Sequence, residues 1–180
     1  MTDAWILAID PGNARGKGAG VALWSPFQSF IFSTVVCPAA PGDVAAFLET
    51  FAPRPWSGVR RDAEGRPVRA AVDLPIHVFI EDQYPGPKTA YKSLRTLIRR
   101  AWTWGAILEG VYGCAPVAFV NPSSWQSKVL RGAPGANTKE RSIFVAERAL
   151  GRKVQSDDEA DAVCLLLYAQ QKLRTQGEGG

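Results

Sequence analysis

Histidine and cysteine are scarce in this 180-residue sequence, which contains one histidine and three cysteines. A single histidine, His77, excludes any mechanism that needs several imidazoles, and we expect it to be structural. The cysteines are odd in number, widely spaced and without a C-x-x-C pair, which argues against a disulfide framework and against a zinc site. We expect all three to be core thiols.

Long apolar runs are also missing. The sequence contains no stretch of about 18 apolar residues, the length that a membrane span needs. The N-terminus lacks the basic region, apolar segment and cleavage site of a secretory signal. The length is that of one domain with room for a sizeable core. We therefore expect a single cytoplasmic domain over residues 1–180, without a membrane partner.

Acids are few in one part of the chain. The net charge of +4, from 21 bases and 17 acids, does not by itself indicate nucleic acid. Between residues 84 and 141, however, nine bases stand against two acids, which gives this segment a charge of +7. The positive charge is therefore concentrated in one segment.

Apolar periodicity and Pro/Gly punctuation predict both strands and helices. Residues 4–9, 19–24 and 29–36 are typical of an antiparallel meander of three strands, and two further strands are expected over 76–81 and 117–120. The expected helices cover 42–52, 88–112, 122–130, 138–150 and 157–174, with an insertion over 53–75 that contains a candidate hairpin at Glu64-Gly65 and a disordered tail over 175–180.

The first predicted strand ends in "AIDPG", which places the carboxylate of Asp10 at the end of a buried-looking strand. Asp-Pro-Gly is ordinary turn chemistry, because Pro11 fixes φ and Gly12 accepts a positive φ. A P-loop needs four residues between its glycines and a following helix, whereas three residues separate Gly12 from Gly16 and a strand follows. Glu81 closes the fourth predicted strand in the same way. Asp10 is either a turn residue or one of several acids that hold metal ions.

The last predicted helix begins "QSDDEADAVCLLLYA", in which Ser156 and Glu159 match a capping box. Asp157 and Asp158 then fall in the first turn, where acids favour the helix dipole without any further role. Asp161 resists that explanation, because it lies among apolar residues that indicate burial nearly all round. An uncompensated carboxylate buried there would cost several kcal/mol, so Asp161 needs a cation.

A shared metal ion is the economical partner for Asp161. Asp158 lies on the same helix face, Asp157 is the less favoured alternative, and neither Lys nor Arg lies within a turn on that face. A ligand set without histidine or cysteine suits Mg²⁺ or Mn²⁺, and two such ions about 4 Å apart can catalyse phosphodiester hydrolysis. The candidate ligands are Asp10, Glu81, Asp158 and Asp161. Without these four acids 21 bases face 13 acids, and a basic protein around an acidic site suggests a nuclease.

The order of the predicted elements resembles the ribonuclease H-like fold, an α/β fold whose central mixed five-stranded sheet is flanked by helices. More narrowly, the chain resembles the RuvC-type Holliday-junction resolvases, phage members included, through "AIDPG", "IEDQY", "VNPSSWQSKVLRG" followed by "TKE", and "DDEADAVCLLLYA". The resemblance covers residues 4–170 apart from the insertion. It implies a metal-dependent endonuclease that cleaves four-way junctions and other branched DNA.

The resemblance also implies roles for individual residues. It assigns two Mg²⁺ or Mn²⁺ ions to Asp10, Glu81, Asp158 and Asp161, places Lys128 and Lys139 near the scissile phosphate, and places Tyr84 at the junction centre. It implies a homodimer, since two strands related by symmetry must be nicked.

The helix predicted over 88–112 carries a basic stripe opposite an apolar one. A solvated helix face is the ordinary explanation, yet no acid on that face relieves the repulsion between the bases, whereas phosphate binding would. An apolar flank beside the basic stripe, formed by Tyr91, Ile98 and Trp102, predicts a two-fold dimer contact. The candidate DNA contacts are Tyr84, Lys88, Lys92, Arg95, Arg99, Lys128 and Arg131.

Three other functions were weighed against this hypothesis. A different ribonuclease H-like nuclease could act on ribosomal RNA precursors or RNA–DNA hybrids, and a non-catalytic junction-binding protein could carry vestigial acids. An actin-like ATP-binding domain also begins with an Asp-Gly turn, but it needs a second phosphate loop and a longer chain. We therefore expect no small-molecule cofactor.

Overall fold

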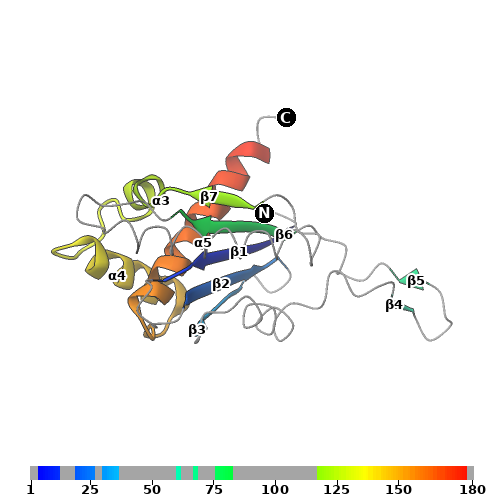
Figure 1. Ribbon diagram of the computed structural model, residues 1–180, viewed down its shortest axis with the longest axis horizontal. Coiled ribbons are helices and arrows are strands. Elements are labelled where there is room, and N and C mark those ends of the chain that lie inside the picture. Colours follow the sequence, from blue (N-terminus) through cyan, green and yellow to red (C-terminus); the bar gives the residue numbers. More distant parts are fainter. Residues whose placement is uncertain are drawn as a thin grey trace, which may run out of the picture.

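The structure is a computed structural model that describes residues 4–12, 19–26, 30–36, 60–61, 67–68, 76–82 and 117–177. The helices expected over 42–52 and 88–112 lie outside these residues. In the described part of the chain, a five-stranded sheet packs against three helices (Figure 1).

The sheet is mixed and has the strand order β3-β2-β1-β6-β7. Its strands are β1 (Trp5–Asp10), β2 (Ala19–Ser25), β3 (Phe30–Val36), β6 (Ile76–Glu81) and β7 (Ala118–Val120). The first three form the expected antiparallel meander, while β6 runs parallel to β1 and β7 runs parallel to β6. The predicted α/β class is thereby confirmed, and this strand order is consistent with the ribonuclease H-like fold.

Two short strands lie within the expected insertion. They are β4 (Arg60–Arg61) and β5 (Pro67–Val68), which pair antiparallel. The hairpin turn expected at Glu64-Gly65 lies outside the described residues. They form a separate two-stranded sheet, which Figure 1 shows apart from the five-stranded sheet. The insertion therefore adds no strand to the main sheet in the described part of the chain.

Polar residues set the bounds of the described helices. The helices are α3 (Pro122–Val129), α4 (Thr138–Leu150) and α5 (Asp157–Gly177). Asn121 and Asn137 cap α3 and α4 by accepting from the backbone N–H of Ser123 and Glu140. Gly151 ends α4 in a left-handed conformation with φ of 68°. The expected end of α5 at residue 174 is wrong, because the helix continues through Gly177 and takes up the first part of the expected tail.

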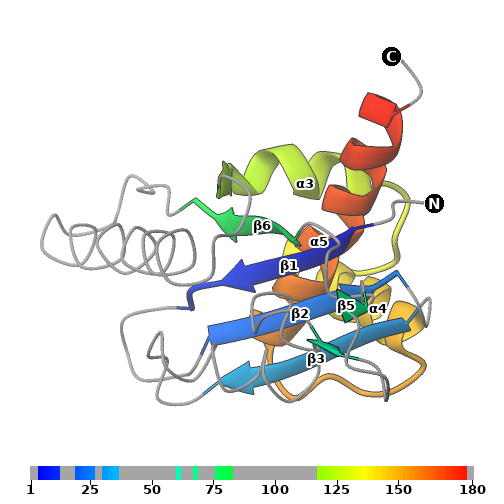
Figure 2. The ribbon, with the colours of Figure 1, turned by 90° about the vertical axis from the view of Figure 1, so that its right-hand side faces the viewer.

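The core lies between the sheet and α5. The helix crosses β1 and β2, with α3 and α4 beside it (Figure 2). All six residues of β1 are buried, which explains why its sequence is a continuous apolar run ending in one acid. From Ala162 to Leu166 every residue of α5 is also buried. Replacing Leu165 by Ala would therefore remove packing worth about 2–5 kcal/mol.

Gly20 allows the first turn of α5 to lie directly on the sheet. In the β1–β2 pairing Gly20 is opposite Asp10. A Cβ atom at this position would overlap the backbone carbonyl of Asp158. The glycine at the start of β2 is therefore a steric requirement for bringing the Asp158 end of α5 next to the Asp10 end of β1.

We expect Gly20→Ala to displace the first turn of α5, because that turn cannot move aside without losing its packing on β2. The free energy of unfolding should fall by about 1–3 kcal/mol, the usual range for overpacking. Amide hydrogen exchange of residues 158–162 should become faster.

Gly151→Ala is the matched control for the loss of a glycine. No atom lies within 4 Å of the added Cβ there, so its cost comes only from the positive φ. The control should leave amide exchange at residues 158–162 unchanged. Wild-type exchange in Gly20→Ala would contradict the steric assignment.

Candidate metal centre

Asp10 and Glu81 end two neighbouring parallel strands. Ile9 pairs with Ile80 in the β1–β6 register, so the two carboxylates follow at the same edge of the sheet. Asp10 is 6% exposed, and its Oδ1 accepts a 2.9 Å hydrogen bond from the N–H of Gly12, whose φ is 67°. Asp10 is therefore a turn residue as well as a member of the acidic site.

A tryptophan from α3 orients Glu81. The indole Nε1 of Trp125 donates to Glu81 Oε2 over 2.9 Å, and the Trp125 side chain is fully buried. The helix can reach this strand because β7 pairs with β6 up to Glu81 and α3 starts directly after β7. Trp125 was not among the predicted site residues.

The first turns of α5 supply Asp158 and Asp161. Asp158 is 8% exposed, and its own backbone carbonyl lies against Gly20. The buried hydroxyl of Ser142 on α4 donates to the backbone carbonyl of Lys139 over 3.0 Å, and its proximity to Asp161 lowers the pKa of that acid. The Asp161 carboxylate oxygen Oδ1 is buried and has no hydrogen-bond partner among the described residues. A buried oxygen of this kind is a candidate cation ligand.

Burial and neighbouring negative charges raise the pKa values of Asp10, Glu81 and Asp161. Burial and the nearby charges of Glu81, Asp161 and Asp158 hold the pKa of Asp10 well above its ordinary value. Burial and the charge of Asp161 raise the pKa of Glu81 to about 7, although the Trp125 hydrogen bond opposes the shift. Burial raises the pKa of Asp161 to about 6, with Asp157 and Asp158 adding to the shift. Strand ends and helix therefore form one electrostatically linked cluster of carboxylates.

The cluster fits a divalent cation in donor type and in charge. Carboxylate oxygens are the ligands that Mg²⁺ and Mn²⁺ prefer, and a cation would relieve the repulsion that raises the pKa values. Within the described ranges, however, no three acidic, histidine or cysteine side chains are arranged to hold a metal ion as they lie. Metal binding therefore requires the carboxylates to rotate towards one another.

Lys139 lies beside this cluster. Its Nζ forms an ion pair with Asp157, which raises the lysine pKa, and Asp158 and Asp161 add to that shift. The face of α5 that carries Asp161 has no base within a turn, as the sequence indicates, and the nearby base comes from α4 instead. The pair also gives Asp157 a role different from that of Asp158.

Lys128 and Arg131 lie at the end of α3. Lys128 Nζ lies 5.4 Å from the ring centroid of Tyr168, two turns beyond Asp161 on α5. Arg131 lines an open hollow of about 410 Å³ between the end of α3 and the start of α4, which Arg141 also lines. Both bases are exposed.

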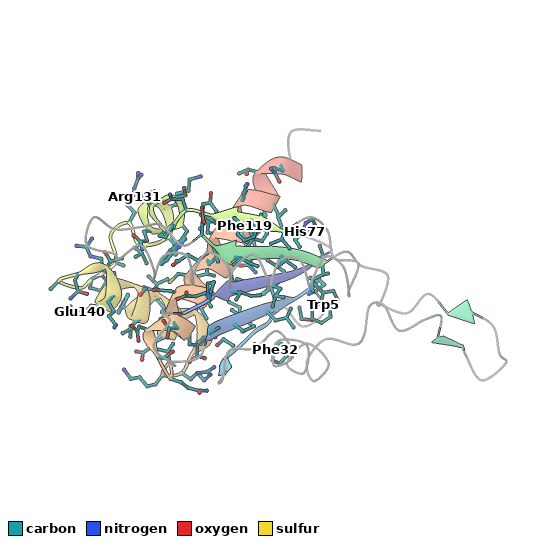
Figure 3. All side chains as sticks on the ribbon, in the orientation of Figure 1. Trp5, Phe32, His77, Phe119, Arg131 and Glu140 are labelled. Carbon is teal, nitrogen blue, oxygen red and sulfur yellow. The ribbon has the colours of Figure 1, made fainter. Side chains whose placement is uncertain are left out.

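Figure 3 shows Arg131 at the end of the sheet where β1 and β6 finish, and His77 at the opposite end. His77 begins β6 and is partly buried, which lowers its pKa. It therefore lies at the other end of the strand from Glu81, as expected of a structural histidine.

The remaining predicted DNA contacts lie outside the described residues. They are Tyr84, Lys88, Lys92, Arg95 and Arg99, and the apolar flank expected at a dimer contact, formed by Tyr91, Ile98 and Trp102, lies outside them too. Their roles stay predictions.

A comparison of the chain with models of protein families found no match, and a comparison with curated proteins found none. None of the helices in the described part of the chain is long and apolar enough to cross a membrane. The site must therefore be interpreted from its own chemistry.

The raised pKa values predict a pH-dependent stability in the absence of divalent ions. As pH rises from 4.5 to about 7, Glu81 ionises in the unfolded chain before it ionises in the folded protein. The folded state then binds more protons, so stability falls with rising pH. Between pH 5 and pH 8 in chelator, the free energy of unfolding from urea titrations should fall by about 2 kcal/mol through Glu81 alone.

Glu81→Gln should flatten this pH dependence, because the amide does not titrate. The control is Glu147→Gln, which removes a carboxylate paired with Lys153 on the surface of α4. It should keep the wild-type slope. A slope of opposite sign in the wild type, or no change in Glu81→Gln, would contradict the assignment of a strained carboxylate cluster.

Proposed function

We propose that this protein is a metal-dependent endonuclease that cleaves four-way DNA junctions and other branched DNA. The observation that supports this most strongly is the group of buried carboxylates from β1, β6 and α5, in which Asp10, Glu81 and Asp161 have raised pKa values and the charge of Asp158 adds to each shift. The ribonuclease H-like strand order supports the same proposal.

Two bound Mg²⁺ or Mn²⁺ ions would supply water activation and stabilisation of the leaving 3′ oxygen. Asp10, Glu81, Asp158 and Asp161 would hold them. Trp125 hydrogen-bonds Oε2 of Glu81, which leaves the second oxygen of Glu81 for a cation. Oδ1 of Asp161 has no hydrogen-bond partner among the described residues and is the corresponding oxygen on α5.

Lys139 adds positive charge at the rim of this cluster. Its ion pair with Asp157 holds the ammonium group close to α5, and its side chain remains 59% exposed. An exposed ammonium at this place could contact a backbone phosphate next to the scissile one. The carboxylates alone would repel DNA, so a cation at the rim favours substrate binding.

DNA is the proposed substrate because the segment of the chain that supplies Lys139 to the site is strongly basic in sequence. Nine bases and two acids lie between residues 84 and 141, a segment that includes Lys139. The resemblance to RuvC-type resolvases narrows the substrate to four-way junctions and implies a homodimer. A dimer presents two active sites to the two strands that must be nicked.

Asp10→Asn, Glu81→Gln and Asp161→Asn should each abolish cleavage of a labelled immobile four-way junction in Mg²⁺. Each variant removes a metal-ligand charge without changing side-chain shape. Junction binding in gel-shift assays without divalent ions should stay within about twofold of the wild type, or become tighter as repulsion falls.

Asp158→Asn should also abolish cleavage, whereas Asp157→Asn should only reduce it, because Asp157 contacts Lys139 instead. Glu147→Gln serves as the distant control with full activity. Substantial cleavage by Asp161→Asn would contradict the ligand set, and cleavage of RNA–DNA hybrids in preference to junctions would contradict the substrate.

The hollow beside Arg131 predicts a phosphate contact. Arg131→Gln combined with Arg141→Gln should weaken junction binding and reduce the slope of log affinity against log salt by up to about 1.8, since each lost duplex phosphate contact contributes about 0.9. Arg174→Gln, in the last turn of α5, removes a positive charge away from the hollow and should keep the slope. An unchanged slope in the double variant would show that the hollow faces only water.

A further inference from the structure

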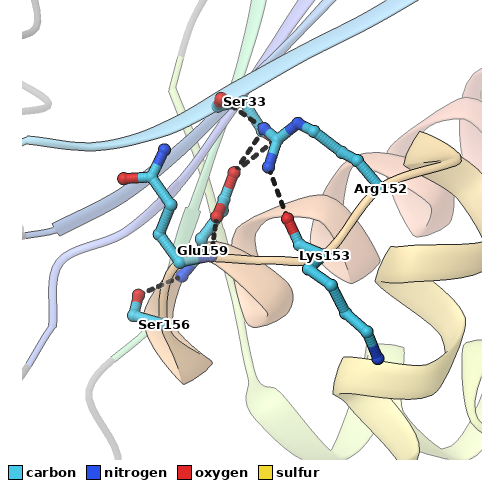
Figure 4. Close-up of polar contacts among 6 residues, drawn as sticks. Ser33, Arg152, Lys153, Ser156 and Glu159 are labelled. Carbon is cyan, nitrogen blue, oxygen red and sulfur yellow. Dashed lines mark hydrogen bonds and ion pairs between the residues drawn. The ribbon is translucent and has the colours of Figure 1, made fainter.

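Glu159 is a wholly buried charge that the proposed chemistry does not use. It follows Asp158 directly, is 0% exposed, and forms an ion pair with Arg152 in which Nη2 and Oε1 are 2.7 Å apart (Figure 4). Its Oε1 also accepts from the hydroxyl of Ser33 over 2.8 Å, and its Oε2 accepts from the N–H of Gln155 over 2.5 Å. Both carboxylate oxygens of Glu159 therefore have partners. Arg152 balances the charge of Glu159, so this acid does not need the cation that the acidic cluster needs.

Arg152 connects this carboxylate to the edge of the sheet. Its Nη2 donates to the backbone oxygen of Ser33 over 2.9 Å and to the Ser33 hydroxyl over 3.0 Å. Its Nη1 donates to the carbonyl of Lys153 over 2.8 Å. Figure 4 shows the guanidinium between β3 and the first turn of α5. One side chain therefore joins β3, the α4–α5 connection and α5.

Because of these contacts, the start of α5 shows only one half of the predicted capping box. Ser156 Oγ accepts from the Glu159 N–H over 3.0 Å, which is one half of the expected capping box. In the other half of a capping box the Glu159 carboxylate would bind the Ser156 N–H. In the contacts described above, the carboxylate binds Arg152, Ser33 and the N–H of Gln155 instead. Glu159 consequently holds α5 against the sheet in addition to closing its first turn.

The first turn of α5 also carries Asp158, a proposed metal ligand, on a different face of the helix from Glu159. Successive residues of an α-helix point about 100° apart, so the direction of Glu159 towards β3 fixes the direction of Asp158 and, one turn later, of Asp161. Gly20 sets how closely the turn approaches β2. The Arg152–Glu159 pair then sets its rotation about the helix axis.

We infer that Arg152 and Glu159 form a positioning clamp that fixes the rotation of α5 and so aims Asp158 and Asp161 at Asp10 and Glu81. The inference rests on the proposed function. Only the Glu159 end of the pair is buried, since the Arg152 side chain is 42% exposed. A position of α5 that separated Glu159 from Arg152 would leave the carboxylate buried without its base, which is strongly unfavourable. Such a pair suits a place where the direction of neighbouring carboxylates matters.

The test compares Mn²⁺ affinity, measured by electron paramagnetic resonance, among folded variants. Arg152→Met alone leaves the Glu159 charge buried and should lower the melting temperature strongly. Arg152→Met with Glu159→Gln removes both charges and should recover most of that loss. Its Mn²⁺ affinity should nevertheless stay about 10- to 100-fold below that of the wild type, as is usual when a group that orients metal ligands is lost.

A neighbouring ion pair gives the matched control. Lys153 Nζ and Glu147 Oε2 are 2.9 Å apart, and this pair joins the same connection to α4. Lys153→Met with Glu147→Gln also removes one positive and one negative charge, and it should keep the wild-type Mn²⁺ affinity.

Arg152→Lys keeps the charge and removes the planar fork that contacts Ser33 and Glu159 together. This variant keeps the test decisive if the double variant does not fold, and we expect it to fold and to bind Mn²⁺ several-fold more weakly. Wild-type Mn²⁺ affinity in Arg152→Lys or in the clamp double variant would overturn the clamp alone. A wild-type protein that binds no Mn²⁺ would overturn the proposed function, and the clamp with it.

Discussion

The arrangement of this protein depends on the repulsion among carboxylates that are buried at one edge of its sheet. Asp10 and Glu81 reach that edge because β1 and β6 are parallel neighbours, and Asp161 reaches it on α5. Burial and mutual repulsion raise their pKa values. A folded protein that keeps such groups together without a cation loses stability, and a divalent cation is the simplest way to offset that loss.

The surrounding residues hold the carboxylates in place in spite of this repulsion. Gly12 hydrogen-bonds Asp10 within the same turn, and Trp125 of α3 hydrogen-bonds Glu81 at the end of β6. Gly20 permits the close approach of α5, and the Arg152–Glu159 pair joins that helix to β3. The site is therefore assembled by contacts between elements that are distant in sequence.

Local sequence patterns were sufficient for the elements. Apolar runs with Pro or Gly at their ends located all five strands of the main sheet to within one residue, because each strand is short and strongly apolar. The acids at the ends of two strands could be recognised in the same way. The predicted end of α5 was three residues too early. No strong helix-stop signal precedes Gly177, so the sequence does not mark an end at residue 174.

Contacts between elements could not be read from local patterns. Trp125 is one of six tryptophans, and nothing near it in sequence marks it as the partner of Glu81, 44 residues away. Ser33 and Glu159 are 126 residues apart, so the capping pattern alone gave no indication that Glu159 contacts the sheet. Lys139 was expected near the scissile phosphate from family resemblance, while its pair with Asp157 depends on how α4 packs beside α5.

Anomalous diffraction from crystals grown with Mn²⁺ tests the central claim most directly. The account predicts two anomalous peaks about 4 Å apart, both within bonding distance of oxygens from Asp10, Glu81, Asp158 or Asp161. A fully occupied Mn²⁺ elsewhere on the protein, with no peak between β1, β6 and α5, would contradict it.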